Sequence, residues 1–192
     1  RQADTAAIAR NFFANGMIFW QPQVDWSGAT NGFVECEFPL YQYLVACLYK
    51  LFGFSEIYAR GLSVFFSCLT LWFLFNLGRK IFNHEAGWWG ALFYALLPIP
   101  VYYGRTVQPE ALMMLLATFS LERWVTYLEE RKTLNLFLSW FAFTLAVMVK
   151  VLPLIWIGIP ILITAWQKGI LFKREIIISP ILTLLLASLW YF

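Results

Sequence analysis

The feature that most restricts the fold of this chain is a series of long apolar segments separated by short charged turns. Each segment contains 16 to 21 residues, close to the roughly 20 residues that a helix needs to cross a ~30 Å hydrocarbon core. Interfacial aromatic residues can complete the shorter segments. The segments are residues 57–77, 86–103, 110–128, 134–149, 151–166 and 176–192.

Composition agrees with a membrane protein. Only 13% of the residues are charged, about half of the usual ~25% of soluble domains. The net charge of +3 is small and dispersed, which argues against a nucleic-acid partner. We therefore expect an all-α fold, a polytopic transmembrane helix bundle of about six spans over residues 54–192.

Residues 1–53 have a different character. Residues 4–14 predict a short amphipathic helix on a membrane surface, ended by Asn15 and Gly16, and residues 21–32 predict an aqueous loop. Residues 38–52 are apolar, but 15 residues give only about 22 Å of helix. We expect a second interfacial or re-entrant helix there, so that residues 1–53 form a long first loop with two interfacial helices.

The two ends of the sequence suggest that the bundle is larger than this chain. The sequence lacks an initial methionine, and it stops inside an apolar segment at Phe192. We expect one membrane helix before Arg1 and further helices or a soluble domain after Phe192.

Cations in the short turns predict the orientation. Two or three cations occur in every second turn, and the turns between them, near Arg105 and Lys150, carry one each. Because cation-rich turns face the cytoplasm, residues 1–53, residues 105–110 and Lys150 are expected together on the outer face. The cation-rich turns are residues 79–80, 131–132 and 168–174.

The first loop contains carboxylates that could do chemistry. Asp4, at the start of a helix, could be a general base or a metal ligand, or only an N-cap. Glu35 and Glu37 could bind a divalent cation with Asp4, or could lie at the edge of a solvated loop. Cys36 between them has no partner at metal-ligand spacing.

Three further residues sit at the ends of apolar segments on the same face. Arg105 could hold a phosphate bidentately or only extend to the membrane surface, and Glu110 could act with it or only complement a helix dipole. Lys150 could bind an anionic head group or reach the surface. Cys47 and Cys68, inside apolar segments, are expected to be small buried hydrophobic side chains.

Several short elements, in this order, resemble the GT-C superfamily of polytopic glycosyltransferases. The resemblance is to the dolichyl-phosphate-mannose protein mannosyltransferase-like branch, which includes bacterial aminoarabinose transferases. The matching elements are Asp4 followed by an Ala/Ile/Arg helix, Glu37-Phe-Pro-Leu40, Ala59-Arg-Gly-Leu-Ser63 leading to residues 77–80, Gly104-Arg105 with Glu110, and Lys150 to Pro153.

The resemblance implies roles for these residues. Asp4 would be the catalytic acid of the first outer loop, and Glu37 would match the acid of a Glu-Lys-Pro-Pro-like element. Phe38 stands where many relatives have lysine, and Glu110 stands where aspartate is commoner. Arg105 and Lys150, together with Glu110, would hold the donor phosphate, and Asp4 and Glu37 could bind Mg²⁺ or Mn²⁺.

The implied activity is transfer of a sugar from a polyprenyl-phosphate donor to a lipid, glycan or protein acceptor. It would take place in a bacterial inner (plasma) membrane, with the active face outward. A transporter or flippase of a lipid-linked glycan is the alternative, although transporters place ionisable residues nearer the midplane. A non-catalytic scaffold subunit is a third possibility, and it would tolerate the loss of Asp4.

Overall fold

The computed structural model describes residues 2–26, 32–34 and 37–191, and these residues are mainly helical. An isolated antiparallel bridge joins Gln23 to Phe33 in the first loop. The helices are α1 (Gln2–Ala14), α2 (Leu40–Phe52), α3 (Glu56–Ile81), α4 (His84–Leu96), α5 (Pro98–Gly104), α6 (Glu110–Glu130), α7 (Thr133–Val149), α8 (Pro153–Trp156), α9 (Gly158–Gln167) and α10 (Arg174–Tyr191).

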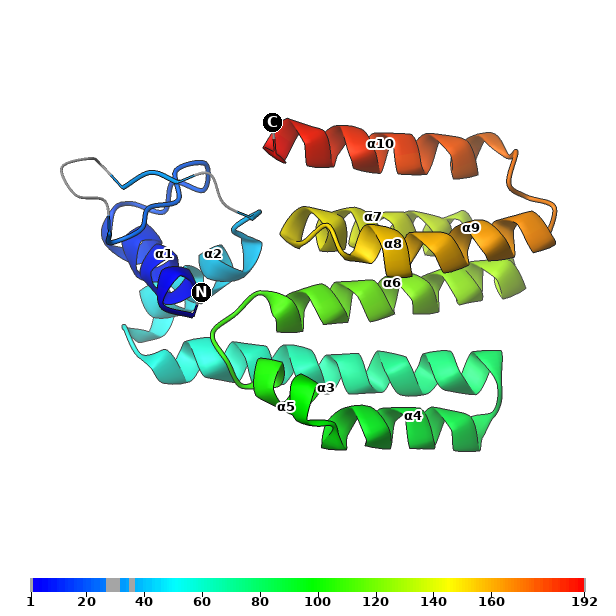
Figure 1. Ribbon diagram of the computed structural model, residues 1–192, viewed down its shortest axis with the longest axis horizontal. Coiled ribbons are helices and arrows are strands. Elements are labelled where there is room, and N and C mark those ends of the chain that lie inside the picture. The colour runs from blue at the N-terminus through cyan, green and yellow to red at the C-terminus, as the bar shows by residue number, and fades with distance from the viewer. Residues whose placement is uncertain (1, 27–31, 35–36, 192) are drawn as a thin grey trace.

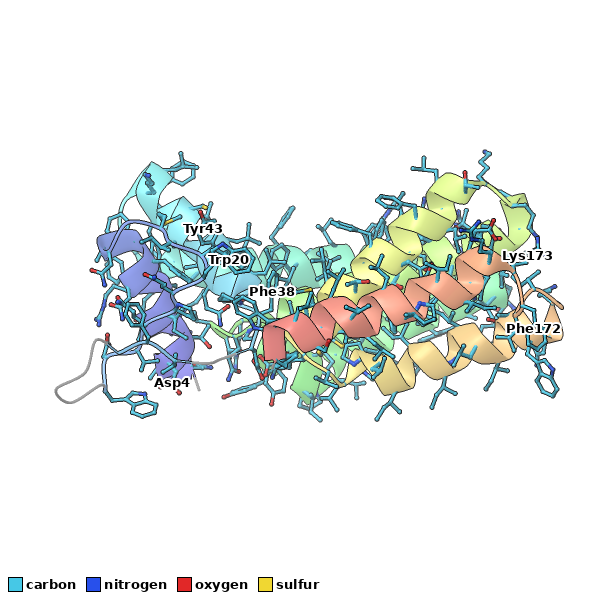
Figure 2. The ribbon with its side chains drawn as sticks, turned by 90° about the horizontal axis from the view of Figure 1, so that it is seen from above. Asp4, Trp20, Phe38, Tyr43, Phe172 and Lys173 are labelled. Carbon is cyan, nitrogen blue, oxygen red and sulfur yellow. The ribbon has the colours of Figure 1, made fainter. Side chains whose placement is uncertain are left out.

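The helices from α3 to α10 run along the long axis of the molecule and form an antiparallel bundle (Figure 1). Helix α6 packs against both α3 and α7, while α4 packs on α3 and α10 packs on α7. Helices α1 and α2 pack on each other and lie across one end of the bundle, as both views show (Figures 1 and 2). This arrangement confirms an all-α fold with two short helices in the first loop.

Local sequence signals account for several of the helix ends. The side chains of Ser55 and Asn83 accept hydrogen bonds from the backbone N–H groups of Ile57 and Ala86, which caps α3 and α4. Pro98 begins α5 directly after Leu97, whose extended backbone ends α4. Arg131 ends α6 in the left-handed conformation, with φ of 59°.

Two predicted segments are divided in the structure. Leu97 separates α4 from α5 within residues 86–103, where Pro98 begins the second helix. Residues 151–166 were expected as a single helix, but Ile157 separates α8 from α9. Pro160 lies in the first turn after this break and has no N–H to donate to the carbonyl of Trp156. The apolar pattern alone does not reveal this interruption.

Two of the described helices are long and apolar enough to cross a membrane on their own, α3 and α10. Helix α7 and the segment Pro153–Gln167 are apolar but shorter. Many large apolar side chains of α10 are exposed, as expected where lipid rather than protein covers a helix. About six spans therefore remains a prediction for the bundle as a whole.

The cation-rich turns lie at one end of the bundle, and the turns with single cations lie at the other. Figure 1 shows the α3–α4, α6–α7 and α9–α10 connections together at the end away from α1 and α2. The α5–α6 and α7–α8 connections, which carry Arg105 and Lys150, lie at the end that α1 and α2 occupy. The two groups of turns inferred from the charges are therefore the two groups found at opposite ends of the bundle.

The cysteine prediction was only partly right. Cys47 is half-buried, whereas Cys68 on α3 is exposed. In a membrane helix the apolar side chains face lipid as well as protein, so an apolar neighbourhood in sequence does not imply burial. Cys36 lies outside the described residues.

Helices α3 and α4 approach each other closely at two glycines. A Cβ atom at Gly78 would lie 2.8 Å from Cα of Gly87, and a Cβ at Gly87 would lie 2.6 Å from the carbonyl oxygen of Phe75. Small residues at such a contact let the backbones of membrane helices pack directly. These glycines therefore set the spacing of the α3–α4 hairpin.

We expect Gly87→Ala to destabilise the bundle by about 1–3 kcal/mol, because the added methyl group must push two backbones apart. Thermal unfolding of the detergent-solubilised protein measures the effect. Gly90→Ala is the matched control, because a Cβ at Gly90 meets nothing within 4 Å. Equal unfolding temperatures for the two variants would contradict the proposed backbone contact.

Candidate functional site

Three predicted site residues meet at the end of the bundle beneath the first loop. Glu37 lies three residues before α2, Glu110 is the first residue of α6, and Lys150 follows the last residue of α7. These elements are far apart in sequence and reach the same end through the antiparallel arrangement of the helices (Figure 1).

Lys150 is the centre of this cluster. Its Nζ lies 2.5 Å from Oε1 of Glu110 and 3.8 Å from Oε1 of Glu37. The side chains of Lys150 and Glu110 are only 11% and 14% exposed, whereas that of Glu37 is 41% exposed. One lysine thus faces two carboxylates, and the local formal charge is −1.

The second oxygen of Glu110 distinguishes this ion pair from a purely structural one. Its Oε2 is buried and has no hydrogen-bond partner among the described residues. A buried carboxylate oxygen without a donor is costly. Glu110 therefore has unused hydrogen-bonding capacity for a ligand that enters next to it.

Short backbone constraints hold the cluster together. Pro109 precedes Glu110 and starts the first turn of α6, and the backbone N–H of Phe38 donates to the carbonyl of Met148 at 3.4 Å. This bond fastens the segment after Glu37 to the last turn of α7, two residues before Lys150.

A cavity of about 370 Å³ adjoins the ion pair. Glu110 and Lys150 line it, and the rest of its wall is mainly apolar. The hydroxyl of Ser67 also lines it, and this oxygen is buried without a described partner. The cavity thus combines an apolar wall with two polar side chains whose buried oxygens lack a described hydrogen-bond partner, a typical composition of a ligand site.

Arg105 lies on a neighbouring cavity rather than in the cluster itself. This second cavity has a volume of about 210 Å³ and shares Ser67, Tyr94, Pro100 and Gly104 with the first. A Cβ at Gly104 would lie 2.7 Å from Oγ of Ser67, so glycine is required where the cavities adjoin. Arg105 is exposed, and none of the ion pairs among the described residues includes it.

A buried chain of hydrogen bonds positions the loop that carries Arg105 and Glu110. The hydroxyl of Tyr41 lies 3.0 Å from the carbonyl oxygen of Ala59 and 2.7 Å from Oγ of Ser63. Ser63 in turn donates to the carbonyl of Thr106 at 2.7 Å. This chain joins α2, α3 and the loop before α6, and the sequence pattern gave no sign of it.

The hydroxyl of Tyr41 is a dependable donor at physiological pH. Burial raises the pKa of Tyr41 to about 12, and the hydrogen bond with Ser63 offsets this only in part. The phenol therefore stays protonated up to strongly alkaline pH.

Asp4 occupies a different part of the first loop. It lies in the first turn of α1, and its Oδ1 accepts a hydrogen bond of 3.1 Å from the indole N–H of Trp26. Figure 2 shows Asp4 at one edge of the α1–α2 layer, while Phe38 lies where this layer meets the bundle. The contacts of Lys150 come from Glu37 and Glu110, and Glu35 lies outside the described residues.

Phe38, the residue after Glu37, belongs to an aromatic cluster. Its ring centroid lies 5.1 Å from that of Phe19 and 5.0 Å from that of Trp190. Tyr43 packs on Phe19 at 5.1 Å, and Trp20 contacts Trp190 (Figure 2). An aromatic side chain at this position fastens the first loop to the end of α10 instead of supplying a charge.

A second buried ion cluster lies inside the bundle, and the sequence reasoning missed it. The carboxylate of Glu122, 2% exposed, accepts from Nζ of Lys80 and Nε of Arg123, both at 2.5 Å. Lys80 also donates to Thr126. The signal was present, because Glu122 and Arg123 interrupt the apolar segment 110–128.

The described residues do not form a complete metal site. Among them, no three His, Cys, Asp or Glu side chains gather closely enough to hold an ion. Asp4 and Glu37 are each of the right chemical type for Mg²⁺ or Mn²⁺.

Comparison with known proteins gives one match. The family model described as dolichyl-phosphate-mannose-protein mannosyltransferase matches residues 37–191, which include Glu37, Arg105, Glu110 and Lys150 but not Asp4. No curated protein and no solved structure matches the chain.

Tyr41→Phe tests the hydrogen-bond chain. The change removes the hydroxyl and leaves Ser63 with one partner fewer, so we expect a loss of about 1–2 kcal/mol of stability. Thermal unfolding in detergent measures it. Tyr43→Phe, on the same helix, is the control, because the hydroxyl of Tyr43 makes no hydrogen bond among the described residues. An equal effect of the two changes would show that the hydrogen bonds of Tyr41 contribute nothing to stability.

Proposed function

The chain belongs to the dolichyl-phosphate-mannose-protein mannosyltransferase family, a group of membrane glycosyltransferases of the GT-C type, and from this premise we propose its reaction. The chain transfers a sugar from a polyprenyl-phosphate donor to an acceptor at the outer face of the membrane. The observation that carries the proposal is the Glu37–Lys150–Glu110 cluster beside an apolar cavity.

In the proposed reaction, an acceptor hydroxyl oxygen attacks the anomeric carbon of the sugar. The bond between that carbon and the phosphate oxygen breaks, and polyprenyl phosphate leaves with the bonding electron pair. A carboxylate takes the proton of the hydroxyl, and the resemblance assigns this role to Asp4. Because the leaving group is already a stable anion, the enzyme mainly positions the reactants and balances charge.

The geometry of Lys150 supports a role at the phosphate. The lysine is buried next to the cavity and oriented by Glu110 before any ligand arrives. A donor phosphate would replace Glu110 at Nζ, since one ammonium group cannot balance two carboxylates and a phosphate. Glu110 and Glu37 would then be available to accept hydrogen bonds from sugar hydroxyls.

Arg105 would supply a second positive charge to the phosphate. It lines the cavity that adjoins the one beside Lys150, and it has no described ion pair to give up. The apolar walls of the two cavities would accommodate the first isoprenoid units of the donor lipid.

The first loop would bring Asp4 to the acceptor. Trp26 donates to one oxygen of Asp4, and its ring is exposed beside the carboxylate. An exposed indole next to a carboxylate suits a carbohydrate, because the ring face packs on sugar C–H groups while the carboxylate accepts from hydroxyls.

A divalent cation bound by Asp4 and Glu37 is a separate proposal. Among the described residues, neither carboxylate belongs to a group of three His, Cys, Asp or Glu side chains that could hold an ion. The reaction above is therefore written without a metal step. Loss of transfer on chelation, restored by Mg²⁺ or Mn²⁺, would support the cation.

Neutralising the central ion pair separates its binding role from its structural one. Lys150→Gln leaves the buried carboxylate of Glu110 without its cation and is expected to cost about 3–5 kcal/mol of stability. The double change Lys150→Gln with Glu110→Gln should regain most of that stability but no sugar transfer, because the phosphate partner is still missing.

The double variant is measured by thermal unfolding and by transfer from a panel of polyprenyl-phosphate sugars. The exposed pair Arg60–Glu56, neutralised in the same way, is the control and should change neither property, because exposed pairs contribute at most about 1 kcal/mol. Wild-type transfer by the Lys150/Glu110 double variant would remove this cluster from the mechanism.

Asp4→Asn should lower sugar transfer by the full-length protein by about 100-fold or more while leaving expression unchanged, because the amide cannot accept the proton. Asp25→Asn is the matched control, since Asp25 is a carboxylate of the same loop whose partner is Arg10. Transfer at the wild-type rate by the Asp4 variant would exclude it as the base.

A further inference from the structure

A long groove between α7 and α10 lies apart from the candidate site. Its volume is about 620 Å³, and most of its lining side chains are apolar, among them Leu136, Leu145 and Leu186. Phe137, 64% exposed, and Leu182, 53% exposed, also line it, so the groove opens at the surface of the bundle. In a membrane protein, an apolar opening of this kind is suited to the acyl chains of the bilayer.

The groove has one charged end. Arg174 and Glu175, at the start of α10, and Thr133, at the start of α7, line it there. Figure 1 shows both helix starts at the end of the bundle opposite the α5–α6 and α7–α8 connections. The groove is therefore separate from the cluster around Lys150.

The charges at this end are mostly positive. The acids in or directly beside the α6–α7 and α9–α10 turns are Glu129, Glu130 and Glu175, and Glu130 is paired with Lys132 at 3.1 Å. Against these three acids stand five cations in the adjoining turns, so an anion is favoured there. The cations are Arg131, Lys132, Lys168, Lys173 and Arg174.

The groove also contains a buried donor that lacks an acceptor. The indole N–H of Trp140 has no hydrogen-bond partner among the described residues, although the side chain is only 7% exposed. Trp140 lies seven residues after Thr133, about 10 Å along the helix. Glycerolipids carry ester carbonyls below the phosphate, and these oxygens can accept from such a donor.

We propose that the α7–α10 groove binds one anionic phospholipid of the surrounding bilayer. An acyl chain lies along the apolar side chains of the two helices, and the phosphate contacts Arg174. The charge at the groove end selects an anionic head group over a zwitterionic one. This site is independent of the proposed sugar transfer, because it shares no residue with the cavities beside Glu110 and Arg105.

Native mass spectrometry of the full-length protein tests the proposal. The protein is taken up in detergent with equal amounts of phosphatidylglycerol and phosphatidylcholine that carry the same acyl chains. We expect one retained phosphatidylglycerol, favoured over phosphatidylcholine. Arg174→Gln should reduce this preference about fivefold, because one protein cation next to an anionic lipid surface contributes about 1 kcal/mol.

Ser179→Phe tests the groove itself, because Ser179 lines it and a phenyl ring would fill it. This change should abolish the retained lipid. Ser188→Phe is the matched control on the same helix, since Ser188 is exposed and does not line the groove. Arg60→Gln is the control for Arg174, because Arg60 is an exposed arginine of α3 that neither lines the groove nor belongs to the five cations at its charged end.

Three results would overturn the proposal. The first is equal retention of the two lipids by the wild-type protein. The second is an unchanged lipid signal in both Arg174→Gln and Ser179→Phe. The third is the absence of any retained lipid, as expected if another segment of the protein fills the groove. Thermal unfolding of each variant shows whether a lost signal reflects lost folding, and Arg174→Gln remains informative if Ser179→Phe does not fold.

Discussion

Two carboxylates of α6, each paired with a lysine from a neighbouring element, fix the position of the central helix. Glu110 pairs with Lys150 after α7, and Glu122 pairs with Lys80 of α3. Apolar side chains can pack in many registers between membrane helices, and lipid competes for the same surfaces. A buried charge allows far fewer registers, because a register that leaves it without its partner costs several kcal/mol. The two pairs therefore select one register of α6 against both of its neighbours.

The same pairing explains why the candidate site lies where it does. The end of α6 that starts at Glu110 is covered by the first loop, which the aromatic cluster around Phe38 and the hydrogen bonds of Tyr41 hold in place. Both attachments join residues far apart in sequence. The family match begins at Glu37, the first residue of this covering segment that contacts Lys150. Fold and site thus share one set of contacts.

The positions of the long helices and the end of the bundle that holds the site residues could be predicted from the sequence. The local helix break, the exposure of single side chains and the contacts within the site could not. Apolar segments and charged turns located the long helices, and alternation of the turns placed Arg105, Glu110 and Lys150 at one end. The break at Ile157 and the exposure of Cys68 depend on local geometry and on lipid-facing surfaces, which hydropathy does not resolve. The contact between Lys150 and Glu110 depends on how α6 packs against α7, and the position of Arg105 on a neighbouring cavity depends on how α5 packs against α3.

The glycine contact between α3 and α4 bears on how the chain is made. Helix α4 has 13 residues, about 20 Å of helix, and does not span a ~30 Å hydrocarbon core by itself. Its contact with the 26-residue α3 through Gly78 and Gly87 makes the two helices one hairpin. A translocating machinery would meet that hairpin as a single unit. A substitution at either glycine would therefore lower the amount of protein inserted into the membrane. It would not lower the catalytic rate of the molecules that are inserted.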